Sequence, residues 1–522
     1  MAPDLELTQS IRRTAGLVPA GIATVDGDRV TTHAEFVDRV ARAAGGLRSL
    51  GVGPGDRVSA LALNSASFLE HYMACWWLGA VPAPLNIRWS DAEIAAALDM
   101  VGSRVLLVDA AFAERGETAC SAVPSIEHVV RLDDPPGTGT LTWQALVTDG
   151  ERLQDGGHGG DDAAILLFTG GTTGRPKAVE LSHRNLVVAG IGMRAMGCAT
   201  GARVLHCPPL FHMGGIQMSV AHWLGGGTHV MMPGFDPVGV ARAVQEHRVT
   251  DLLLAPTMIE MFLRQPDLGS YDLGSLVQIV YGTSPMTPSL LERAMEVIPD
   301  ARFVQGYGMT ETAMTVMLGA EHHRPEQRES GRMASIGVPS PLAEVRIVDA
   351  EGADCPCGTP GELLVRGPSV MKGYWNDPEQ TAHVLDGDGW LHTGDGARLD
   401  EEGFVYLTDR IKDMIITGGE NVYSVEVEKV LTRHPAIASV AVVGVPHPVW
   451  GEAVHAVVVP AEGTALTGEE LIAFAREHLA SFKVPRTVEF VARLPLSAAG
   501  KVLKNVVRER ARRSSSAAPA SV

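Results

Sequence analysis

The chain has 522 residues, of which 45% are apolar and 20% charged, and its formal net charge is −18 at pH 7. This length exceeds what one core supports, so two or more domains are expected, and the composition is typical of a globular protein. The acidic balance argues against a general nucleic-acid binder, which needs a broad basic surface.

The amino terminus carries no recognisable targeting signal. Residues 1–16 (MAPDLELTQSIRRTAG) have neither an apolar stretch nor a small-residue cleavage pattern. No run of roughly 18 apolar residues occurs, so no membrane span is predicted. Six scattered cysteines fit a reducing compartment, and the Cys355-Pro-Cys357 pair is interpreted as a turn rather than a metal site. We therefore expect a cytoplasmic protein with small-molecule partners.

Strands and helices alternate through the first two thirds of the chain. The pattern predicts strands within 54–64, 79–86, 103–108, 163–168 and 276–281, and helices over 67–78 and 287–297. Alternation of this kind favours layered α/β structure. From about residue 343, short segments between turn residues predict antiparallel strands at 343–349, 361–367 and 403–409.

A separate α/β pattern follows near the carboxyl end. It predicts a helix at 425–434, strands at 437–445 and 453–461, and a second helix at 468–480. The expected division is a domain over 1–409, a hinge at 410–413, a small domain over 414–511 and a disordered tail over 512–522.

A glycine-rich loop gives the strongest local signal. The apolar run AAILLF leads into FTGGTTGRPK, so the loop leaves a buried strand. Glycines allow main-chain amides to face an anion, threonines add hydroxyl donors, and the lysine adds a charge. A Walker A loop is excluded because Pro176 and Ala178 flank the lysine. The residues predicted to hold polyphosphate are Thr169, Gly170, Gly171, Thr172, Thr173, Gly174 and Lys177.

This loop resembles the phosphate loop of the adenylate-forming enzymes, a superfamily of acyl-CoA synthetases, luciferases and peptide-synthetase adenylation domains. Here Gly170 stands where serine is usual, and Ala178 stands where glycine is common. One hydroxyl donor is therefore missing, while a glycine at this position still allows the main-chain amides to face an anion.

Further segments match the superfamily in order along nearly the whole chain. Residues 209–212 resemble the segment whose last residue, His212, lies beside the acyl site. Residues 281–285 resemble the turn that frames adenine, with Gly282, Thr283 and Ser284. Residues 305–311 resemble the most diagnostic adenylate motif, with Gln305, Gly306, Tyr307, Gly308, Thr310 and Glu311. The resemblance implies that Tyr307 stacks on adenine, Thr310 contacts the α-phosphate and Glu311 holds Mg²⁺, as suits a hard carboxylate.

Further motifs that resemble those of the superfamily occur beyond residue 390. By resemblance, Asp395 binds the ribose hydroxyls, Arg410 reaches ribose or phosphate, and Lys412 is the hinge residue. Lys501, after LPLSAAG, resembles the catalytic lysine whose charge suits the pentavalent phosphate of the transition state.

The candidate coenzyme A site is carried by four residues. Gly418 and Gly419 resemble the wall of the pantetheine channel. Trp450 resembles a residue that packs on the CoA adenine in some relatives, with a tryptophan that merely covers a strand end as the alternative. Arg88 lies where some relatives contact CoA phosphate.

The resemblance implies an α/β fold, with a large N-terminal domain of stacked sheets and helices, a β-rich subdomain and a small mobile C-terminal domain. It implies an AMP-forming acyl-CoA ligase that uses ATP, Mg²⁺ and coenzyme A. The alternatives are a ligase that loads a carrier-protein thiol and a non-catalytic nucleotide sensor. Segments 213–223, 281–286 and 306–316 contain no Lys or Arg, which favours a hydrophobic monocarboxylate, either a fatty acid or an aryl acid. The sequence leaves the oligomeric state open, a homodimer included.

Overall fold

The computed structural model describes residues 5–133, 140–170, 176–284, 286–324, 327, 330–410, 413–417, 420–496 and 502–516. The chain folds into two compact units. The first comprises Met1–Val345 and Val365–Leu391, and the second comprises Arg346–Leu364 and His392–Val522.

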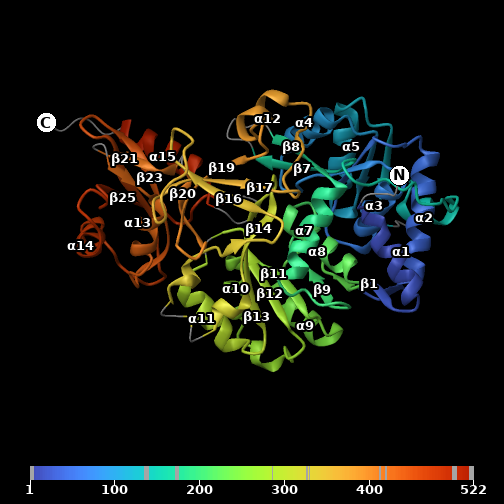
Figure 1. Cartoon of the computed structure of the whole chain (residues 1–522), viewed down its shortest axis with the longest axis horizontal. Helices are drawn as coiled ribbons and strands as arrows, with labels where there is room; N and C mark the ends of the chain where they lie inside the picture. Colours follow the sequence, from blue (N-terminus) through green and yellow to red (C-terminus); the bar gives the residue numbers. More distant parts are fainter. Residues whose placement is uncertain are drawn as a thin grey trace. The chain divides into compact units, whose positions relative to one another are not determined.

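A mostly parallel sheet forms the centre of the first unit (Figure 1). Strands β1, β10, β9, β11, β12 and β13 run parallel, and β2, β14 and β15 are antiparallel to their neighbours. In spatial order the strands are β15 (Val338–Pro339), β14 (Ala313–Leu318), β13 (Arg302–Met309), β12 (Gln278–Gly282), β11 (Asp251–Leu254), β9 (Arg203–His206), β10 (Thr228–Met231), β1 (Ile22–Asp26) and β2 (Arg29–Thr32).

Helices cover both faces of this main sheet, as Figure 1 shows. Side chains alternate along a strand, so Leu252 and Leu254 of β11 pack with α9 (Pro237–His247), α10 (Pro256–Leu263) and α11 (Pro288–Val297). Leu253 points to the other face, where it packs with α7 (His183–Ala195) and α8 (Met213–Leu224). Because both faces are covered, the parallel strands read as continuous apolar runs in the sequence.

A second, fully parallel sheet follows the order β4 (Val81–Pro84), β3 (Arg57–Leu61), β5 (Val105–Val108) and β6 (His128–Arg131). Its connections include α3 (Ala66–Leu78), buried from Ala66 to Trp77, α4 (Asp91–Val101) and α5 (Ala113–Ala122). The remaining helices of the unit are α1 (Leu7–Leu17), α2 (His33–Ser49), α6 (Trp143–Asp149) and α12 (Pro378–Val384).

A small antiparallel sheet completes the first unit. It joins β7 (Ala163–Gly170) and β8 (Pro176–Ser182) in a hairpin, with β18 (Gly373–Tyr374) beside β8. Leu166, Phe168 and Ala178 share a core with Leu106 and Val108 of the second sheet. The hairpin is thereby anchored at the end that carries the glycine-rich loop.

The second unit contains two sheets. One follows the order β16 (Glu344–Val348), β17 (Gly361–Arg366), β19 (Leu391–Leu399) and β20 (Val405–Arg410). The other follows the order β22 (Glu420–Val422), β21 (Ile415–Thr417), β24 (Gly451–Pro460) and β23 (Ile437–His447), and β25 (Thr487–Phe490) also pairs with β24.

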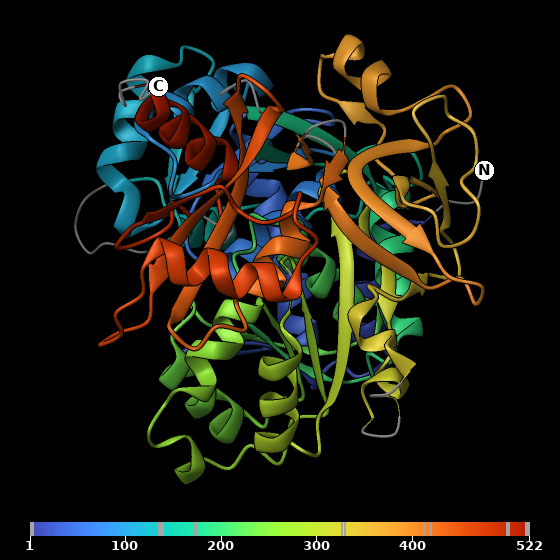
Figure 2. The ribbon, with the colours of Figure 1, turned by 90° about the vertical axis from the view of Figure 1, so that its left-hand side faces the viewer.

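Period-two alternation also organises the carboxyl-terminal sheet. Val440 and Val442 pack with α13 (Ser424–Leu431) and α14 (Gly468–His478). Ala441 and Val443 point to the opposite face, against α15 (Lys504–Ser516). Figure 2 shows these helices around the long β23–β24 ladder.

The α/β fold class is confirmed, as are the predicted strands and helices in both parts of the chain. One prediction needs correction: α15 continues through Ser516, so residues 512–516 of the expected disordered tail are helical. Arg512 and Arg513 are strong helix formers that continue the helix from Ala511, and the serines form its last turn. Residues 517–522 lie outside the described part of the chain.

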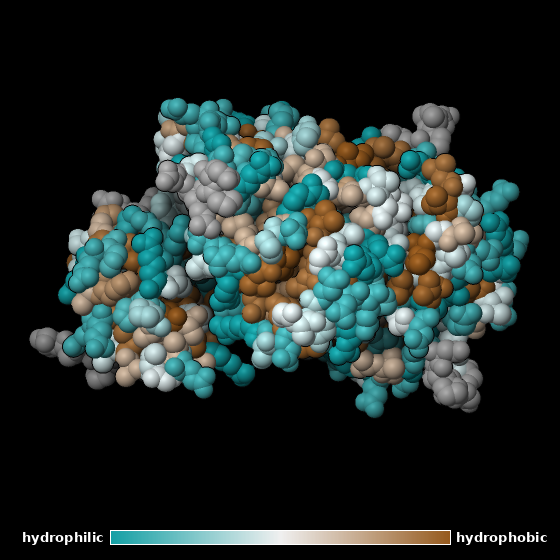
Figure 3. All heavy atoms as spheres, turned by 90° about the horizontal axis from the view of Figure 1, so that it is seen from below, coloured by the Kyte–Doolittle hydropathy of each residue, from teal (hydrophilic) through white to brown (hydrophobic). Residues whose placement is uncertain are grey.

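Within the described residues, no helix is both long and apolar enough to cross a membrane. On the face drawn in Figure 3, hydrophobic side chains are interspersed with hydrophilic ones.

Candidate active site

The hairpin of β7 and β8 carries the predicted phosphate-binding loop at its tip. Thr169 pairs with Lys177 and Gly170 with Pro176 across β7 and β8. The strands therefore meet at both ends of the glycine-rich loop, and Lys177 lies at its base. Gly171, Thr172, Thr173 and Gly174 lie outside the described residues.

Tyr374 links this hairpin to the acidic motif residue Glu311. The Lys177 ammonium lies 4.7 Å from the centre of the Tyr374 ring and donates a hydrogen bond of 2.8 Å to Gln380 Oε1. The Tyr374 hydroxyl donates a hydrogen bond of 2.9 Å to Glu311 Oε1. One tyrosine thus contacts both the candidate phosphate lysine and the candidate magnesium ligand. Sequence reasoning missed Tyr374 and Gln380, because neither lies in a segment whose residue types alone point to ATP chemistry.

Glu311 is held in place from its backbone as well as its side chain. It lies in the turn between β13 and β14, is only 5% exposed, and its carbonyl accepts a hydrogen bond of 2.8 Å from the Met371 amide. Burial and the adjacent Glu311 charge raise the pKa of Tyr374, so its hydroxyl stays a proton donor to the carboxylate. Thr310, the preceding motif residue, is partly exposed in the same turn.

The two predicted adenine segments lie side by side on neighbouring parallel strands. Gly282, at the end of β12, pairs with Gly306 of β13. A Cβ built on Gly282 would lie 2.2 Å from the Gly306 carbonyl oxygen, so only glycine allows this approach. Thr283 then takes φ of +69°, a strained conformation for a β-branched residue and typical of functional turns. Ser284 follows directly, and Pro285 lies outside the described residues.

Strand β13 carries the next predicted residues. Gln305 and Tyr307 are both partly buried, and the antiparallel β13–β14 ladder has an irregularity between Tyr307 and Gly308. A Cβ on Gly308 would lie 1.7 Å from the Ala313 carbonyl oxygen. The glycines of this motif are therefore needed for strand packing, whatever the ligand.

A buried Tyr281–His323 pair lies directly before the Gly282–Ser284 turn. The Tyr281 hydroxyl lies 2.8 Å from His323 Nε2, and His323 Nδ1 lies 2.9 Å from the Gly319 carbonyl oxygen. Because a carbonyl only accepts, Nδ1 carries the proton and Nε2 accepts from the tyrosine. Burial lowers the pKa of His323 to about 4, so it is neutral near pH 7.

His212, the residue predicted to lie beside the acyl site, precedes helix α8. It is the N-cap residue of α8, and its ring packs against Phe211 at 4.6 Å between centres. The segment before it is fixed by Asn64, which accepts from the Leu210 amide and donates to the Pro208 carbonyl. The Tyr72 hydroxyl also donates to the Leu210 carbonyl, at 2.9 Å. No sequence pattern pointed to Asn64 or Tyr72 as supports of this segment.

The predicted ribose residues lie in the second unit. Asp395 of β19 pairs directly with Arg410 of β20. The residues of β19 before Asp395 are held by Glu362 of β17, whose carboxylate accepts from the Gly394 amide at 3.1 Å, while His392 Nδ1 lies 2.8 Å from it. Thr393 donates to the Leu363 carbonyl at 2.7 Å, so contacts with β17 position the stretch of strand that carries Asp395.

The predicted hinge, channel and catalytic lysine residues, Lys412, Gly418, Gly419 and Lys501, lie outside the described residues. Trp450 is described: its ring stacks on His447 at 4.3 Å, and the Arg486 guanidinium lies 4.4 Å from its centre. These contacts hold the Trp450 ring between the end of β23 and the start of β24. Arg88 is exposed in the turn after β4, where its amide donates to Asn86 Oδ1 at 3.0 Å.

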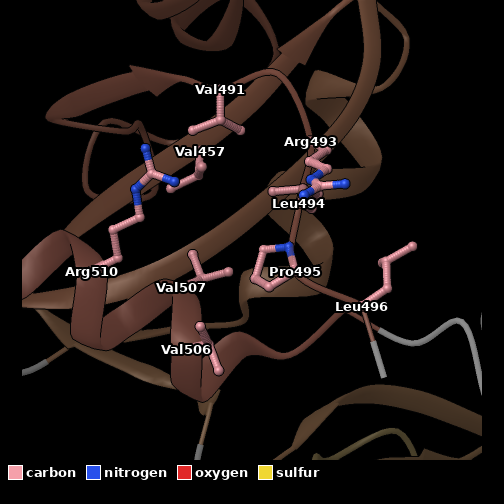
Figure 4. A pocket seen from close by; sticks show the side chains of 9 residues that line it. All are labelled: Val457, Val491, Arg493, Leu494, Pro495, Leu496, Val506, Val507 and Arg510. Carbon is pink, nitrogen blue, oxygen red and sulfur yellow. The ribbon is translucent and has the colours of Figure 1, made fainter. Parts of the chain in front are cut away.

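The second unit also contains a cavity of about 590 Å³ near the end of its chain (Figure 4). Its walls combine apolar side chains such as Val457, Leu494 and Val507 with the guanidinium groups of Arg493 and Arg510. The described lining residues include no hydroxyl or carboxylate, so they do not form the polar environment that ribose requires.

Comparison with known proteins places these motifs in one family. The family model "AMP-binding enzyme" matches residues 11–375, and "AMP-binding enzyme C-terminal domain" matches residues 426–501. A feruloyl-CoA synthase from Amycolatopsis sp is 41% identical, covering 95% of this chain and 97% of the relative. The fatty acid–[acyl-carrier-protein] ligase ScoC of Streptomyces coeruleorubidus is 35% identical, covering 97% of each. ATP-bound MatB from Rhodopseudomonas palustris superposes with a TM-score of 0.87 at 29% identity, covering 98% of this chain and 99% of that structure.

Proposed function

We propose that this chain, which belongs to the AMP-binding enzymes, transfers a hydrophobic monocarboxylic acid to coenzyme A. The chain is an AMP-forming acid–thiol ligase that acts on ATP and a carboxylic acid. The proposal adds the identity of the thiol and the class of the acid. Within that class we place aryl acids of the hydroxycinnamate type first. The reaction would form an acyl-adenylate and pyrophosphate, then acyl-CoA and AMP.

The observation that carries the proposal is the contact chain from Lys177 through Tyr374 to Glu311. It joins a cation at the base of the phosphate loop to a buried carboxylate in the adenylate motif. Phosphoryl chemistry needs both groups in fixed positions, because its catalysis is mainly positioning and electrostatic stabilisation. A nucleotide sensor has no use for that arrangement, so the geometry favours an enzyme.

Each candidate residue has a role in the adenylation step. Thr169, Gly170 and Lys177 would bind the pyrophosphate portion of ATP, with Thr310 at the α-phosphate. Tyr307 and the Gly282–Ser284 turn would hold the base, and Asp395 and Arg410 the ribose. Lys501 would stabilise the charge as the carboxylate oxygen attacks the α-phosphorus and pyrophosphate leaves.

Glu311 fits a magnesium ligand. Its buried carboxylate offers the hard oxygen that Mg²⁺ prefers, and Tyr374 fixes its orientation. Bound there, Mg²⁺ would neutralise charge on the phosphate oxygens of ATP.

Two features support the substrate class. A relative that is 41% identical over almost the whole chain is a feruloyl-CoA synthase. Helix α8 and strands β13 and β14, which follow or carry the motif residues, contain no Lys or Arg between 213 and 223 or between 306 and 316. A second carboxylate on the substrate would lack a cationic partner there.

The experiment is a two-stage assay on the full chain. Pyrophosphate exchange over a panel of fatty, aryl and dicarboxylic acids should rank hydroxycinnamates first and dicarboxylates last. AMP release with the best acid is then compared between CoA and an acyl-carrier protein. Exchange without CoA-dependent AMP release, but with carrier loading, would favour a carrier-protein ligase like ScoC. Absence of exchange with every acid would contradict the enzyme assignment.

Gly419 offers a direct test of the acceptor. Gly419→Leu should block the thiol arm while leaving pyrophosphate exchange intact, so acyl-adenylate accumulates. Trp450→Ala serves as the comparison and should mainly raise the CoA requirement, since stacking on an aromatic contributes about 1–3 kcal/mol. A folded Gly419→Leu protein with full CoA transfer would remove the channel from the proposal.

A stiffened hinge separates the two half-reactions in another way. Lys412→Pro should permit adenylation but prevent CoA transfer, because proline fixes φ. Normal overall turnover in this variant would place the hinge elsewhere.

A further inference from the structure

Three buried side chains of types that bind metals lie close together at the end of the main sheet where its parallel strands begin. Cys198 follows α7, His222 lies in the last turn of α8, and Asp251 is the first residue of β11. The candidate ATP residues, in contrast, follow the carboxyl ends of β12 and β13. The Cys198 sulfur, one His222 ring nitrogen and one Asp251 oxygen all lie within 4.8 Å of one another.

These three side chains are almost completely inaccessible. Their residues are 4%, 1% and 2% exposed, respectively. A cysteine, a histidine and an aspartate from three separate elements thus converge in the interior of the first unit, whereas the candidate adenine residues lie toward the carboxyl ends of β12 and β13.

The protonation pattern of His222 leaves a lone pair directed into this group. His222 Nδ1 lies 2.8 Å from the Met218 carbonyl oxygen and must donate to it, so Nε2 of the neutral ring is an acceptor. Nε2 is buried without a hydrogen-bond partner among the residues that the structure describes. It faces Asp251 Oδ1 at 3.7 Å, longer than the roughly 2.7–2.9 Å of a charge-assisted hydrogen bond. A buried carboxylate and an imidazole nitrogen that face each other need a cation between them, either a proton on Nε2 or a metal ion.

We propose that Cys198, His222 and Asp251 bind one divalent transition-metal ion, Zn²⁺ by the chemistry of the donor set, at a structural site separate from the ATP site. Thiolate, imidazole and carboxylate are the donors that Zn²⁺ takes in proteins. A thiolate and a carboxylate together balance the charge of a divalent cation, and the proton of the Cys198 thiol leaves to solvent on binding.

The distances suit a tetrahedral ion. Zinc–nitrogen and zinc–oxygen bonds of about 2.0–2.2 Å at tetrahedral angles place the two donor atoms roughly 3.3–3.6 Å apart. The 3.7 Å separation of Nε2 and Oδ1 is slightly longer, so a small side-chain adjustment would bring these atoms and the sulfur into bonding distance of the ion.

The surrounding contacts orient the donors as outer-shell groups of a metal site do. The Met218 carbonyl fixes the His222 ring, and the Thr250 hydroxyl donates to Asp251 Oδ2 at 2.5 Å, leaving Oδ1 toward the cluster. Gln278, the first residue of β12, donates to the Cys198 sulfur at 3.5 Å. Its own Oε1 is buried without a partner among the described residues, and a half-turn of the amide would offer it as the fourth ligand.

Metal content of the purified full chain tests the proposal. The wild type, loaded with Zn²⁺ and desalted without ATP, should retain close to one equivalent per chain by elemental analysis. Cys198→Ser should lose it, while Cys207→Ser should keep it, since Cys207 is an equally buried free thiol outside the group. Bound Zn²⁺ should also raise the melting temperature of the wild type but not of Cys198→Ser.

Cobalt substitution provides a readout that does not depend on a mutant folding. The wild type reloaded with Co²⁺ should show a thiolate-to-cobalt charge-transfer band and tetrahedral visible absorption. Asp251→Asn and His222→Gln should weaken both. A wild type that stays metal-free under these conditions, or a Cys198→Ser protein that keeps the charge-transfer band, would overturn the site, and neither result would bear on the acid–thiol ligase assignment.

Discussion

Replacing Tyr374 by phenylalanine removes one hydroxyl and little else. The ring stays, so the packing beneath the Lys177 ammonium is kept, with its 4.7 Å approach to the ring centre. What disappears is the 2.9 Å hydrogen bond to Glu311 Oε1. Tyr374 is 9% exposed and Glu311 5%, so water has little access to replace the lost donor.

The magnitude follows from that burial. A hydrogen bond to a charged group contributes about 1.5–3 kcal/mol, and a buried acceptor left without its donor bears its desolvation cost. If Tyr374 positions Glu311 for Mg²⁺, this energy is lost from the transition state. At about 1.4 kcal/mol per decade, kcat/KM for adenylation should fall roughly 10- to 150-fold.

Pyrophosphate exchange measured against Mg²⁺ concentration is the suitable assay. The Tyr374→Phe protein should need more Mg²⁺ for half-maximal exchange, because its carboxylate is less well oriented. Tyr271→Phe is the matched control, since its ring only packs at the edge of the main-sheet core. If the rate of pyrophosphate exchange and its Mg²⁺ dependence were unchanged in a folded Tyr374→Phe protein, the hydrogen bond from Tyr374 to Glu311 would not contribute to adenylation.

Three further outcomes are expected. Gly308→Ala should lower the melting temperature, because its Cβ would lie 1.7 Å from the Ala313 oxygen and such overpacking costs about 1–3 kcal/mol, whereas Gly234→Ala, with open space around it, should not. Lys501→Ala should cripple adenylation yet spare thioester formation from supplied acyl-adenylate, and an equal loss in both half-reactions would contradict a lysine used only in the first. Burial lowers the pKa of His323 to about 4 from 6.5, so between these pH values the unfolded chain binds a proton that the folded chain does not, and stability falls as the pH falls. His323→Gln should flatten the decline in melting temperature across that window, and an unchanged slope would assign the acid sensitivity to other groups.

Local pattern was sufficient to predict most elements. Helix 67–78 and strand 103–108 appear as α3 and β5, and alternation over 437–461 predicts β23 and β24. These segments are buried on the faces that their periodicity indicates, so hydrophobic patterning and tertiary packing favour the same structure. Tail residues 512–516 differ from the prediction because their low complexity suggested disorder, whereas the helix that begins at Lys504 continues through them.

The linear motifs were likewise enough to predict the family, because the glycines, Lys177 and Glu311 occur in short strings of characteristic residue types; their roles toward ATP remain predictions. Tertiary structure alone decided what supports them. Tyr374 reaches Glu311 only because β18 pairs with β8, and Asn64 reaches the segment before His212 from a connection in another sheet. Cys198, His222 and Asp251 are separated by 24 and 29 residues and share no spacing pattern, so only the convergence of a turn, a helix end and a strand start reveals them as a group. A sequence records residues in chain order, whereas a site depends on distances that folding alone creates.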